Sequence, residues 1–486
     1  MTVEGKNPAS APDKWGAPTR EVLGMAVPVI IATCSGTLMS FVDFWMVSHL
    51  SLDAAAALSP SAILVFACIS FFMGVLTCTN TFVSQSFGRG TYDECARYTW
   101  QGLWVSALVG IGSIALWPLA PFIFQWLKHG PDLQHLETIY FQWRIPSIGA
   151  IVAITALAGF FLGIGRPGVT MVAAILANAL NVIFNWVLIY GNWGAPKMGV
   201  AGSALATVLA CWIQLAILMA VYLLPTFNLK YGSRRCWRVD WPRMGRLFHV
   251  GVPAGLSMLL DVGTWGLFVN IFIGKFGATA LAASNMATQW MHLSFMPTVG
   301  LGIAVTALVG QNIGRRDIPR ARSRGRAGLM LGMGYMAVLG AAFFIFREPL
   351  IRVFLLADEP NAAEVVSLGA KILILAAAFQ LFDGMGIVSS SALKGAGDTR
   401  FPMLTTIVLG LLVFVPLCFI FRAFAFGALG AWVAATIYIF LLGIVLLARW
   451  STHAWENIDI FRKKAAEPVE VPSRPTPYEP GDETSA

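Results

Sequence analysis

The chain has 486 residues, of which 57% are hydrophobic and only 12% charged, and its formal net charge is +8. An ordinary globular domain carries about 25% charged residues. Stretches of about twenty residues here carry one charge or none, and that length crosses a bilayer core about 30 Å thick. The composition therefore excludes a soluble globular protein and predicts an all-α polytopic membrane protein.

Apolar runs occur from one end of the chain to the other and predict twelve spanning helices. In chain order they lie near residues 24–49, 58–84, 99–120, 140–163, 168–190, 200–224, 249–274, 280–310, 327–346, 367–392, 402–421 and 427–448. The first run is too long for a cleavable signal peptide, so we expect it to remain as an anchor. The seven cysteines are scattered, which predicts neither a disulfide framework nor a zinc site.

Basic residues are concentrated in alternate loops. When the loops between the predicted helices are numbered, the even ones hold most of the Lys and Arg residues, above all in 225–248 and 311–326. The positive-inside rule then places both termini and the even loops in the cytoplasm. The positive charge therefore reflects membrane topology rather than nucleic-acid binding, and we expect a multi-pass protein of the plasma (bacterial inner) membrane.

The two halves of the chain share a set of short motifs. Val83-Ser-Gln-Ser-Phe-Gly88 is echoed by Val309-Gly-Gln-Asn-Ile-Gly314, Val27-Pro28 by Val252-Pro253, Gly199-x-x-Gly202 by Gly427-x-x-Gly430, and Gly163-x-Gly165 by Gly395-x-Gly397. The matches keep their order, at offsets between 225 and 232 residues. They predict two six-helix bundles related by a pseudo-two-fold axis along the membrane normal, an arrangement in which transporters often hold substrate at the repeat interface.

The repeat and the loop charges give an expected division of the chain. It comprises a cytoplasmic N-terminal segment (1–20), an N-terminal six-helix bundle (21–224), a basic cytoplasmic linker (225–248), a C-terminal six-helix bundle (249–448) and a cytoplasmic tail, largely disordered (449–486).

Three acidic residues lie inside the predicted helices: Asp43, Asp261 and Asp383. A carboxylate at the centre of a spanning helix costs about 2.5–3.5 kcal/mol, so it usually faces a polar cavity or a partner. Each could simply tie two helices together, or it could exchange a proton or Na⁺ for a cationic substrate. Asn181 and Asn185 lie four residues apart on one helix face, where asparagines more often join helices than bind ligands.

Other features of the chain narrow its function. Pro28 should kink the first helix. No catalytic or nucleotide-binding motif is present, so we expect no enzyme activity and no cofactor. The energy for transport should then come from an ion gradient.

Four further stretches complete a family pattern. They are Val27-Pro28 followed by Phe41-Val-Asp43-Phe-Trp-Met-Val47, Phe72-Met-Gly74 followed by Val83 to Gly88, Pro297-x-x-Gly300-Leu followed by Val309 to Gly314, and Leu393-Lys-Gly-Ala-Gly-Asp-Thr399. With these motifs, residues 20–448 resemble the multidrug and toxin extrusion (MATE) family of cation-coupled antiporters.

The resemblance implies two six-helix bundles around a V-shaped central cleft. It also implies a monomer in the membrane lipid that exchanges H⁺ or Na⁺ for organic cations or hydrophobic drugs by alternating access. Asp261 and Asp383 would form a cation or proton site in the C-terminal half, where Na⁺ could bind, and no other metal is expected. Asp43 with Asn181 and Asn185 would form a second site in the N-terminal half.

The main alternative is a lipid-linked oligosaccharide flippase of the same superfamily. Its anionic substrate would require Arg or Lys residues in the cavity. The first, second, seventh and eighth predicted helices carry none before Lys275, which favours the antiporter.

Overall fold

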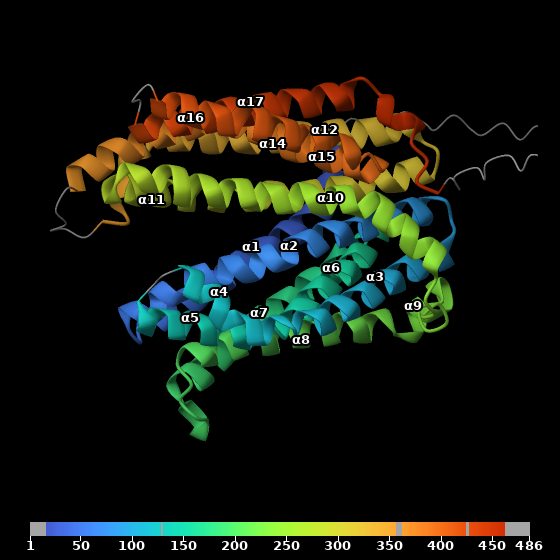
Figure 1. Ribbon diagram of the computed structural model, residues 1–486. Helices are drawn as coiled ribbons and strands as arrows, with labels where there is room; N and C mark the ends of the chain where they lie inside the picture. Colours follow the sequence, from blue (N-terminus) through green and yellow to red (C-terminus); the bar gives the residue numbers. More distant parts are fainter. Residues whose placement is uncertain (1–15, 128–129, 356–361, 424–426, 462–486) are drawn as a thin grey trace, which may run out of the picture.

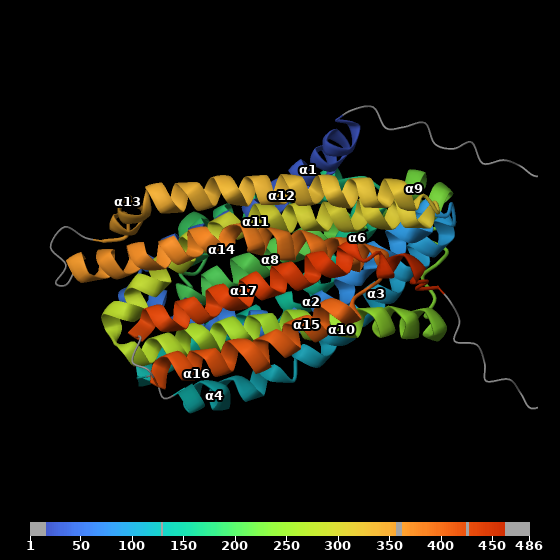
Figure 2. The same ribbon diagram turned by 90° about the horizontal axis from the view of Figure 1, so that it is seen from above.

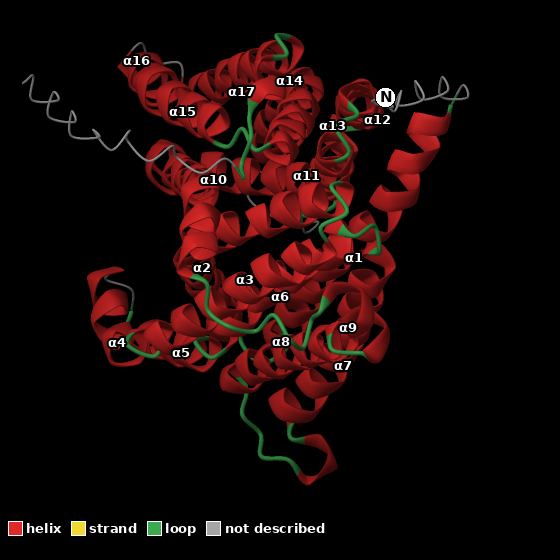
Figure 3. Ribbon diagram, turned by 90° about the vertical axis from the view of Figure 1, so that its right-hand side faces the viewer, coloured by secondary structure: helices red, strands yellow, loops and turns green. Residues whose placement is uncertain are grey.

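The structure is a computed structural model that describes residues 16–127, 130–355, 362–423 and 427–461. All regular structure in these ranges is helical (Figure 3). The α-helices are α1 (Ala17–Ser48), α2 (Leu52–Gly88), α3 (Tyr92–Ser113), α4 (Leu116–Leu127), α5 (Pro131–Arg144), α6 (Ser147–Gly163), α7 (Pro167–Tyr190), α8 (Val200–Tyr222), α9 (Pro225–Tyr231), α10 (Trp241–Leu267), α11 (Ala278–Gly314), α12 (Ile318–Ile345), α13 (Arg347–Arg352), α14 (Ala362–Ala396), α15 (Arg400–Leu409), α16 (Val415–Ala423) and α17 (Gly427–Ser451). Short 3₁₀ segments are η1 (Asn192–Gly194), η3 (Ile273–Phe276) and η5 (Ala454–Asn457), and π-helical segments are η2 (Phe268–Phe272) and η4 (Gly410–Phe414).

The described helices confirm a polytopic membrane protein. Ten are long and apolar enough to cross a bilayer, or up to twelve if each of two bent pairs counts as one span. The pairs are α3 with α4, bent by 61°, and α5 with α6, bent by 45°. Pro146 stands directly before α6 and cannot donate the backbone hydrogen bond that would continue a straight helix. The twelve predicted spans are thus reached only with both bent pairs included.

The chain forms two helical halves, α1–α8 and α10–α17, which are the lower and upper groups in Figure 1. In the second half α14 packs against α11, α12 and α17, as the view from above shows (Figure 2). Hydrophobic clusters fill the interior of each half, and two of them also include residues from the other half.

The halves meet along two matching helix crossings. A Cβ atom added to Gly74 of α2 would lie 2.6 Å from the Cα of Gly255 in α10, and one added to Gly300 of α11 would lie 2.9 Å from the Cα of Ile30 in α1. Gly300 follows Gly74 by the same offset that relates Gln311 to Gln85, and Gly255 follows Ile30 by nearly the same number. The internal repeat read from the sequence is therefore present as a pseudo-symmetric pair of contacts, and glycine is required where the backbones approach this closely.

One end of the molecule holds the start of α1, the ends of α2, α11 and α17 and the segment after α17; we call it the termini side. Here Gly88 and Gly314 approach so closely that a Cβ atom on either would collide with the backbone of the other helix. The buried side chain of Gln85 donates a hydrogen bond to the Gly395 carbonyl at 3.0 Å, and that of Gln311 donates one to the Gly163 carbonyl at 2.9 Å. Each glutamine reaches into the opposite half. We call these two bonds the glutamine latch, which joins the halves on the termini side.

The connection between the halves is held firmly against α3. Trp100 donates its indole N–H to the Ser233 carbonyl at 2.6 Å, and Trp104 donates to the Trp237 carbonyl at 2.7 Å. Gln101, between them, exchanges hydrogen bonds with the backbone of residues 238 and 240. The segment expected as linker thus contains α9, and α10 already begins at Trp241.

The expected terminal segments fall mainly outside the described residues. These are the N-terminal segment up to residue 15 and the tail from residue 462 onward. The part of the tail that is described, up to Phe461, follows α17 and packs against the helices.

Candidate functional site

The best-formed polar cluster lies in the N-terminal half, between α1, α7 and α8. Asp43 is buried, with 6% of its surface exposed. Its Oδ1 accepts a hydrogen bond from Asn185 at 2.5 Å, and its Oδ2 accepts one from the Thr207 hydroxyl at 3.0 Å. The Asn185 amide also donates to Asn181 Oδ1 at 3.0 Å. The structure therefore brings together Asp43, Asn181 and Asn185, as predicted, and adds Thr207.

Two further hydrogen bonds fix the register of α1 against α7. Asn178 donates to the Ser35 hydroxyl on one side of the cluster, and the Tyr190 hydroxyl donates to the Met46 carbonyl at 2.8 Å on the other. Because these residues flank the cluster along both helices, Asn185 is held opposite Asp43. This rigidity favours a binding site with a fixed geometry.

The cluster retains an acceptor and a nearby positive charge. Asn185 Oδ1 is buried and has no hydrogen-bond partner among the described residues. Arg144, at the end of α5, interacts electrostatically with Asp43 but forms no ion pair with it. The amide that contacts Asp43 thus carries a buried oxygen that no other described group uses.

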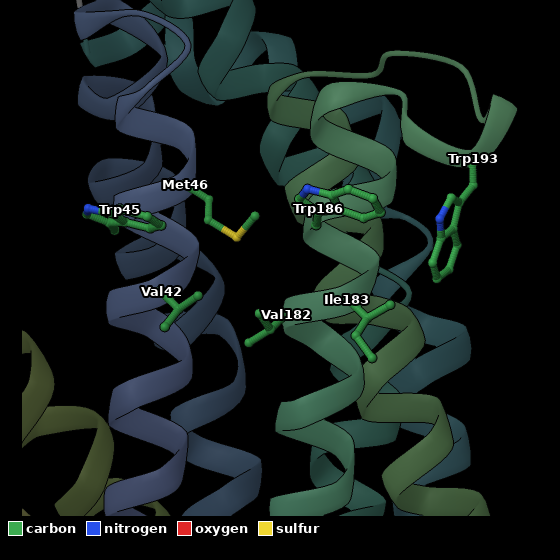
Figure 4. Close-up of a pocket in the computed structure, with 7 residues that line it drawn as sticks. All are labelled: Val42, Trp45, Met46, Val182, Ile183, Trp186 and Trp193. Carbon is green, nitrogen blue, oxygen red and sulfur yellow. The ribbon is translucent and has the colours of Figure 1, made fainter.

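An open apolar cavity of about 430 Å³ lies next to this cluster, between α1 and α7 (Figure 4). Its lining residues are Val42, Trp45, Met46, Val182, Ile183, Trp186 and Trp193. Neither Asp43 nor either asparagine lines it. The polar cluster and the apolar cavity therefore occupy different faces of the same two helices.

The corresponding place in the C-terminal half is filled with aromatic rings. By the repeat offsets, Phe268 stands where Asp43 stands in the first half, and Ala435 stands where Thr207 stands. Phe268 is 1% exposed and packs edge-on against Trp432, with ring centroids 5.1 Å apart. It also meets Phe414 at a tilt, with centroids 5.3 Å apart. The polar cluster is thus not duplicated.

The carboxylates of the C-terminal half lie elsewhere. Asp261 on α10 and Asp383 on α14 are both partly buried and interact electrostatically with each other. Tyr438 of α17 interacts with both, and Lys394, near the end of α14, interacts with Asp261. Neither carboxylate has a hydrogen bond or an ion pair with any other described side chain. Two acids that interact electrostatically and have no hydrogen bond of their own can share one proton or bind a monovalent cation.

No larger metal-binding group is found among the described residues near Asp43 or near the pair Asp261 and Asp383. Within the described ranges no three His, Cys, Asp or Glu side chains gather closely enough to hold a metal ion. Asp43 and the pair Asp261 and Asp383 form separate clusters, one in each half. Pro28 lies inside α1, which continues through it as one helix, so its kink remains a prediction.

Comparison with known proteins identifies the family. The MatE family profile matches residues 28–187 and again residues 253–420. The chain belongs to the MatE family. The two matches begin at Pro28 and Pro253, the prolines that the sequence repeat pairs, so each half is one family unit.

Curated relatives match over most of the chain. The "Probable multidrug resistance protein NorM" of Mesorhizobium japonicum is 31% identical over 451 residues, covering 91% of this chain and 96% of the relative. The "Multidrug resistance protein NorM" of Burkholderia vietnamiensis is 29% identical over 398 residues, covering 82% of this chain and 85% of the relative. These relatives support a MATE family transporter, as the sequence motifs predicted.

Solved structures show the same fold. A structure described as the outward-facing conformation of a multidrug resistance MATE family transporter superposes with a TM-score of 0.81 at 20% identity, covering 90% of this chain and 96% of that one. A transporter of the MOP superfamily from Pyrococcus furiosus, reported to have a binding pocket of reversed polarity, gives a TM-score of 0.81 at 20% identity with the same coverage. Both confirm two packed helical halves.

Three residues of this MatE family chain were missed by sequence reasoning as site residues. Thr207 is one hydroxyl in an apolar helix, and Tyr438 is one of several aromatic residues in α17. In the sequence, Lys394 stands out only as part of the helix-end motif Leu393 to Thr399. The repeat could have directed attention to Thr207, because its counterpart Ala435 lacks the hydroxyl that bonds Asp43.

Proposed function

We propose that this MATE family transporter exports organic cations or hydrophobic drugs in exchange for H⁺ or Na⁺. The multidrug resistance names of its relatives support the substrate class. The observation that carries the coupling is the pair Asp261 and Asp383, because these two acids interact inside a spanning region without hydrogen-bonded partners of their own.

The charge of the pair gives the exchange its physical basis. Two ionised carboxylates in a low-dielectric region repel each other and attract a cation. A coupling ion would neutralise them in one conformation, and a cationic substrate would replace that ion in the other. Such an exchange drives transport only if each ligand binds the two conformations with different affinity.

The N-terminal cluster is proposed as a second protonatable site. Asp43 there accepts hydrogen bonds from Asn185 and Thr207, and these bonds favour its ionised form against the burial that disfavours it. Protonation would require the Asn185 amide or the Thr207 hydroxyl to reorient. A change of protonation at Asp43 would therefore change how α1 packs against α7 and α8.

We also propose that the termini side is cytoplasmic in the plasma membrane. The basic residues Arg234, Arg235, Arg315 and Arg316 are exposed there, which agrees with the positive-inside rule. The glutamine latch joins the halves at this side. The described conformation is then closed toward the cytoplasm.

The test uses purified protein in proteoliposomes with a fluorescent organic cation. A pH gradient and a Na⁺ gradient are imposed separately, and efflux is measured for the wild type, Asp261→Asn and Asp383→Asn. We expect one gradient to drive efflux and each substitution to abolish it. Glu348→Gln, which removes an exposed carboxylate outside the pair, is the matched control and should transport normally.

Either of two results would contradict the proposal. Gradient-driven efflux that survives both substitutions would remove Asp261 and Asp383 from coupling. No response to either gradient would favour the flippase alternative, which would then be tested with a fluorescent lipid-linked sugar in the same vesicles.

A further inference from the structure

The segment that follows α17 contacts both halves of the molecule. It leaves α17 at the right-hand side of Figure 1, where the chain is red, and turns toward the N-terminal half. We call residues 454–461 the C-terminal strap. Its first part, η5, packs on the C-terminal half, and its last residues reach the N-terminal core.

The first part of the strap is anchored on its own half. The Trp455 ring is 1% exposed and stacks on Trp450 of α17, with centroids 4.3 Å apart and planes only 1° apart. Its indole N–H donates to the Trp450 carbonyl at 2.9 Å. Glu456 accepts two hydrogen bonds from Arg322 of α12, at 2.6 and 2.7 Å. This end of the strap therefore moves with the C-terminal half.

The second part crosses to the other half. Ile460 is buried in the cluster that contains Phe82 and Tyr98, and the ring of Phe461 lies edge-on to both. Asp459 forms an ion pair with Arg89 at 3.1 Å, and the Arg89 guanidinium lies 4.1 Å from the centroid of Phe461. The N-terminal half thus holds the strap through a buried contact, not through surface charge alone.

The strap contacts α14 close to one of the two latch bonds. Gly397, two residues after the Gly395 carbonyl that accepts from Gln85, has a positive φ of 93°. A Cβ atom there would lie 2.2 Å from Ile460. The strap therefore contacts the end of α14 two residues from the carbonyl that accepts the Gln85 bond.

The repeat shows that this crossing is particular to the C-terminus. The corresponding segment after α8 is α9, whose Phe227 packs among Phe160 and Phe161 of its own half. The segment after the last helix of the first repeat, α9, thus packs on its own half. The segment after the last helix of the second repeat, the strap, joins the two halves. A contact between the halves must break whenever they separate on that side.

We propose that the C-terminal strap restrains alternating access by holding the termini side closed, and that it must withdraw from the N-terminal half before that side opens. This inference rests on the proposed transport cycle, because a rigid scaffold would have no second state. It makes the strap a regulatory element. Anything that binds the free strap would favour the open state.

The first test loosens the strap and measures opening directly. Ile460→Asp with Phe461→Ser should raise the population opened at the termini side about tenfold or more, because the contacts of one buried and one half-buried apolar side chain are lost. Hydrogen exchange of residues 80–90 and 303–316, at the ends of α2 and α11, should then speed up by that factor. Asn457→Ser, an exposed strap position, is the control. Unchanged exchange at both helix ends would overturn the proposal.

The second test fixes the strap and guards against simple loss of stability. In a background without the seven native cysteines, a short reducible thiol cross-linker joins Arg89→Cys to Asp459→Cys, across the halves. The matched control joins Arg322→Cys to Glu456→Cys, within one half. We expect the first link to slow exchange at the ends of α2 and α11 reversibly, and the second to leave it unchanged. If the ends of α2 and α11 exchange equally in the two linked proteins, the strap does not hold the termini side closed. That conclusion would stand even if Ile460→Asp with Phe461→Ser had sped up exchange, because faster exchange alone could come from a general loss of stability.

Hydrogen exchange requires no transport, so this result is independent of the coupling assay. Loss of gradient-driven efflux with intact strap behaviour would refute the proposed coupling alone. Normal efflux, together with strap variants that do not change opening of the termini side, would refute only the proposal that the strap restrains that opening.

Discussion

The glutamine latch allows a prediction that depends directly on the pseudo-symmetry of the structure. Gln85→Ala and Gln311→Ala each remove one buried hydrogen bond between the halves. Because the two bonds are repeat-related and similar in length, we expect the two substitutions to weaken closure of the termini side by similar amounts.

The magnitude follows from the environment of each bond. A neutral hydrogen bond contributes about 0.5–1.5 kcal/mol net, and leaving a buried carbonyl without a partner costs about 1–3 kcal/mol. The carbonyls of Gly395 and Gly163 would lose these partners. We therefore expect each substitution to favour the opened state by about 1–2 kcal/mol, which is roughly a 5- to 30-fold change in population.

The assay is a distance measurement between spin labels on the two halves. The labels are placed at Arg235→Cys and Arg326→Cys, both exposed, in the cysteine-free background. Gln380→Ala is the control, because that buried glutamine donates to Ser294 within one half. Long distances should become more populated in both latch variants and not in the control. If only one latch variant responds, or if Gln380→Ala responds equally, the latch does not act as described.

Three further predictions concern separate parts of the structure. Thr207→Val should lower the melting temperature of the purified protein more than Thr207→Ser, because only valine removes the hydroxyl that donates to Asp43; equal losses would show that the hydroxyl is unimportant. Gly74→Val should prevent close packing of the halves and abolish the short distances between the labels, because its side chain would meet the α10 backbone; unchanged distances would contradict this crossing. Hydrogen bonds from Arg322 lower the pKa of Glu456, and His453 acts in the same direction, so the stability from this pair is present above the ordinary carboxyl range and lost as the pH falls through the lowered pKa. The melting-temperature difference between wild type and Glu456→Gln should therefore shrink at acid pH, and a constant difference would contradict the assignment.

The architecture was largely predictable from the sequence. The length of the apolar runs reports the bilayer thickness, and the repeated glycines report where helices touch, as Gly88 and Gly314 show. The bends of 61° and 45° were not predicted. They arise because two of the spans are built from two helices each, and hydropathy averages over the break.

The candidate site was predictable only where charge made it conspicuous. Asp43 stands out in an apolar helix, and Asn181 and Asn185 lie on one face of a second apolar helix, α7. Thr207 gives no comparable signal, because a lone hydroxyl is common in spanning helices. The strap was expected as part of the cytoplasmic, largely disordered tail, since the few apolar residues around Ile460 are too short a run to predict burial.

The hydrogen bonds from Trp100, Gln101 and Trp104 have a mechanical consequence for the whole molecule. They make the connection before α10 a stiff extension of the N-terminal half, which ends where Asp240 caps α10. Of the helices in the second half, α10 is therefore the one that the chain itself ties to the first. A hinge at that point would let the other helices of the second half rotate while the N-terminal end of α10 keeps its place against the first half.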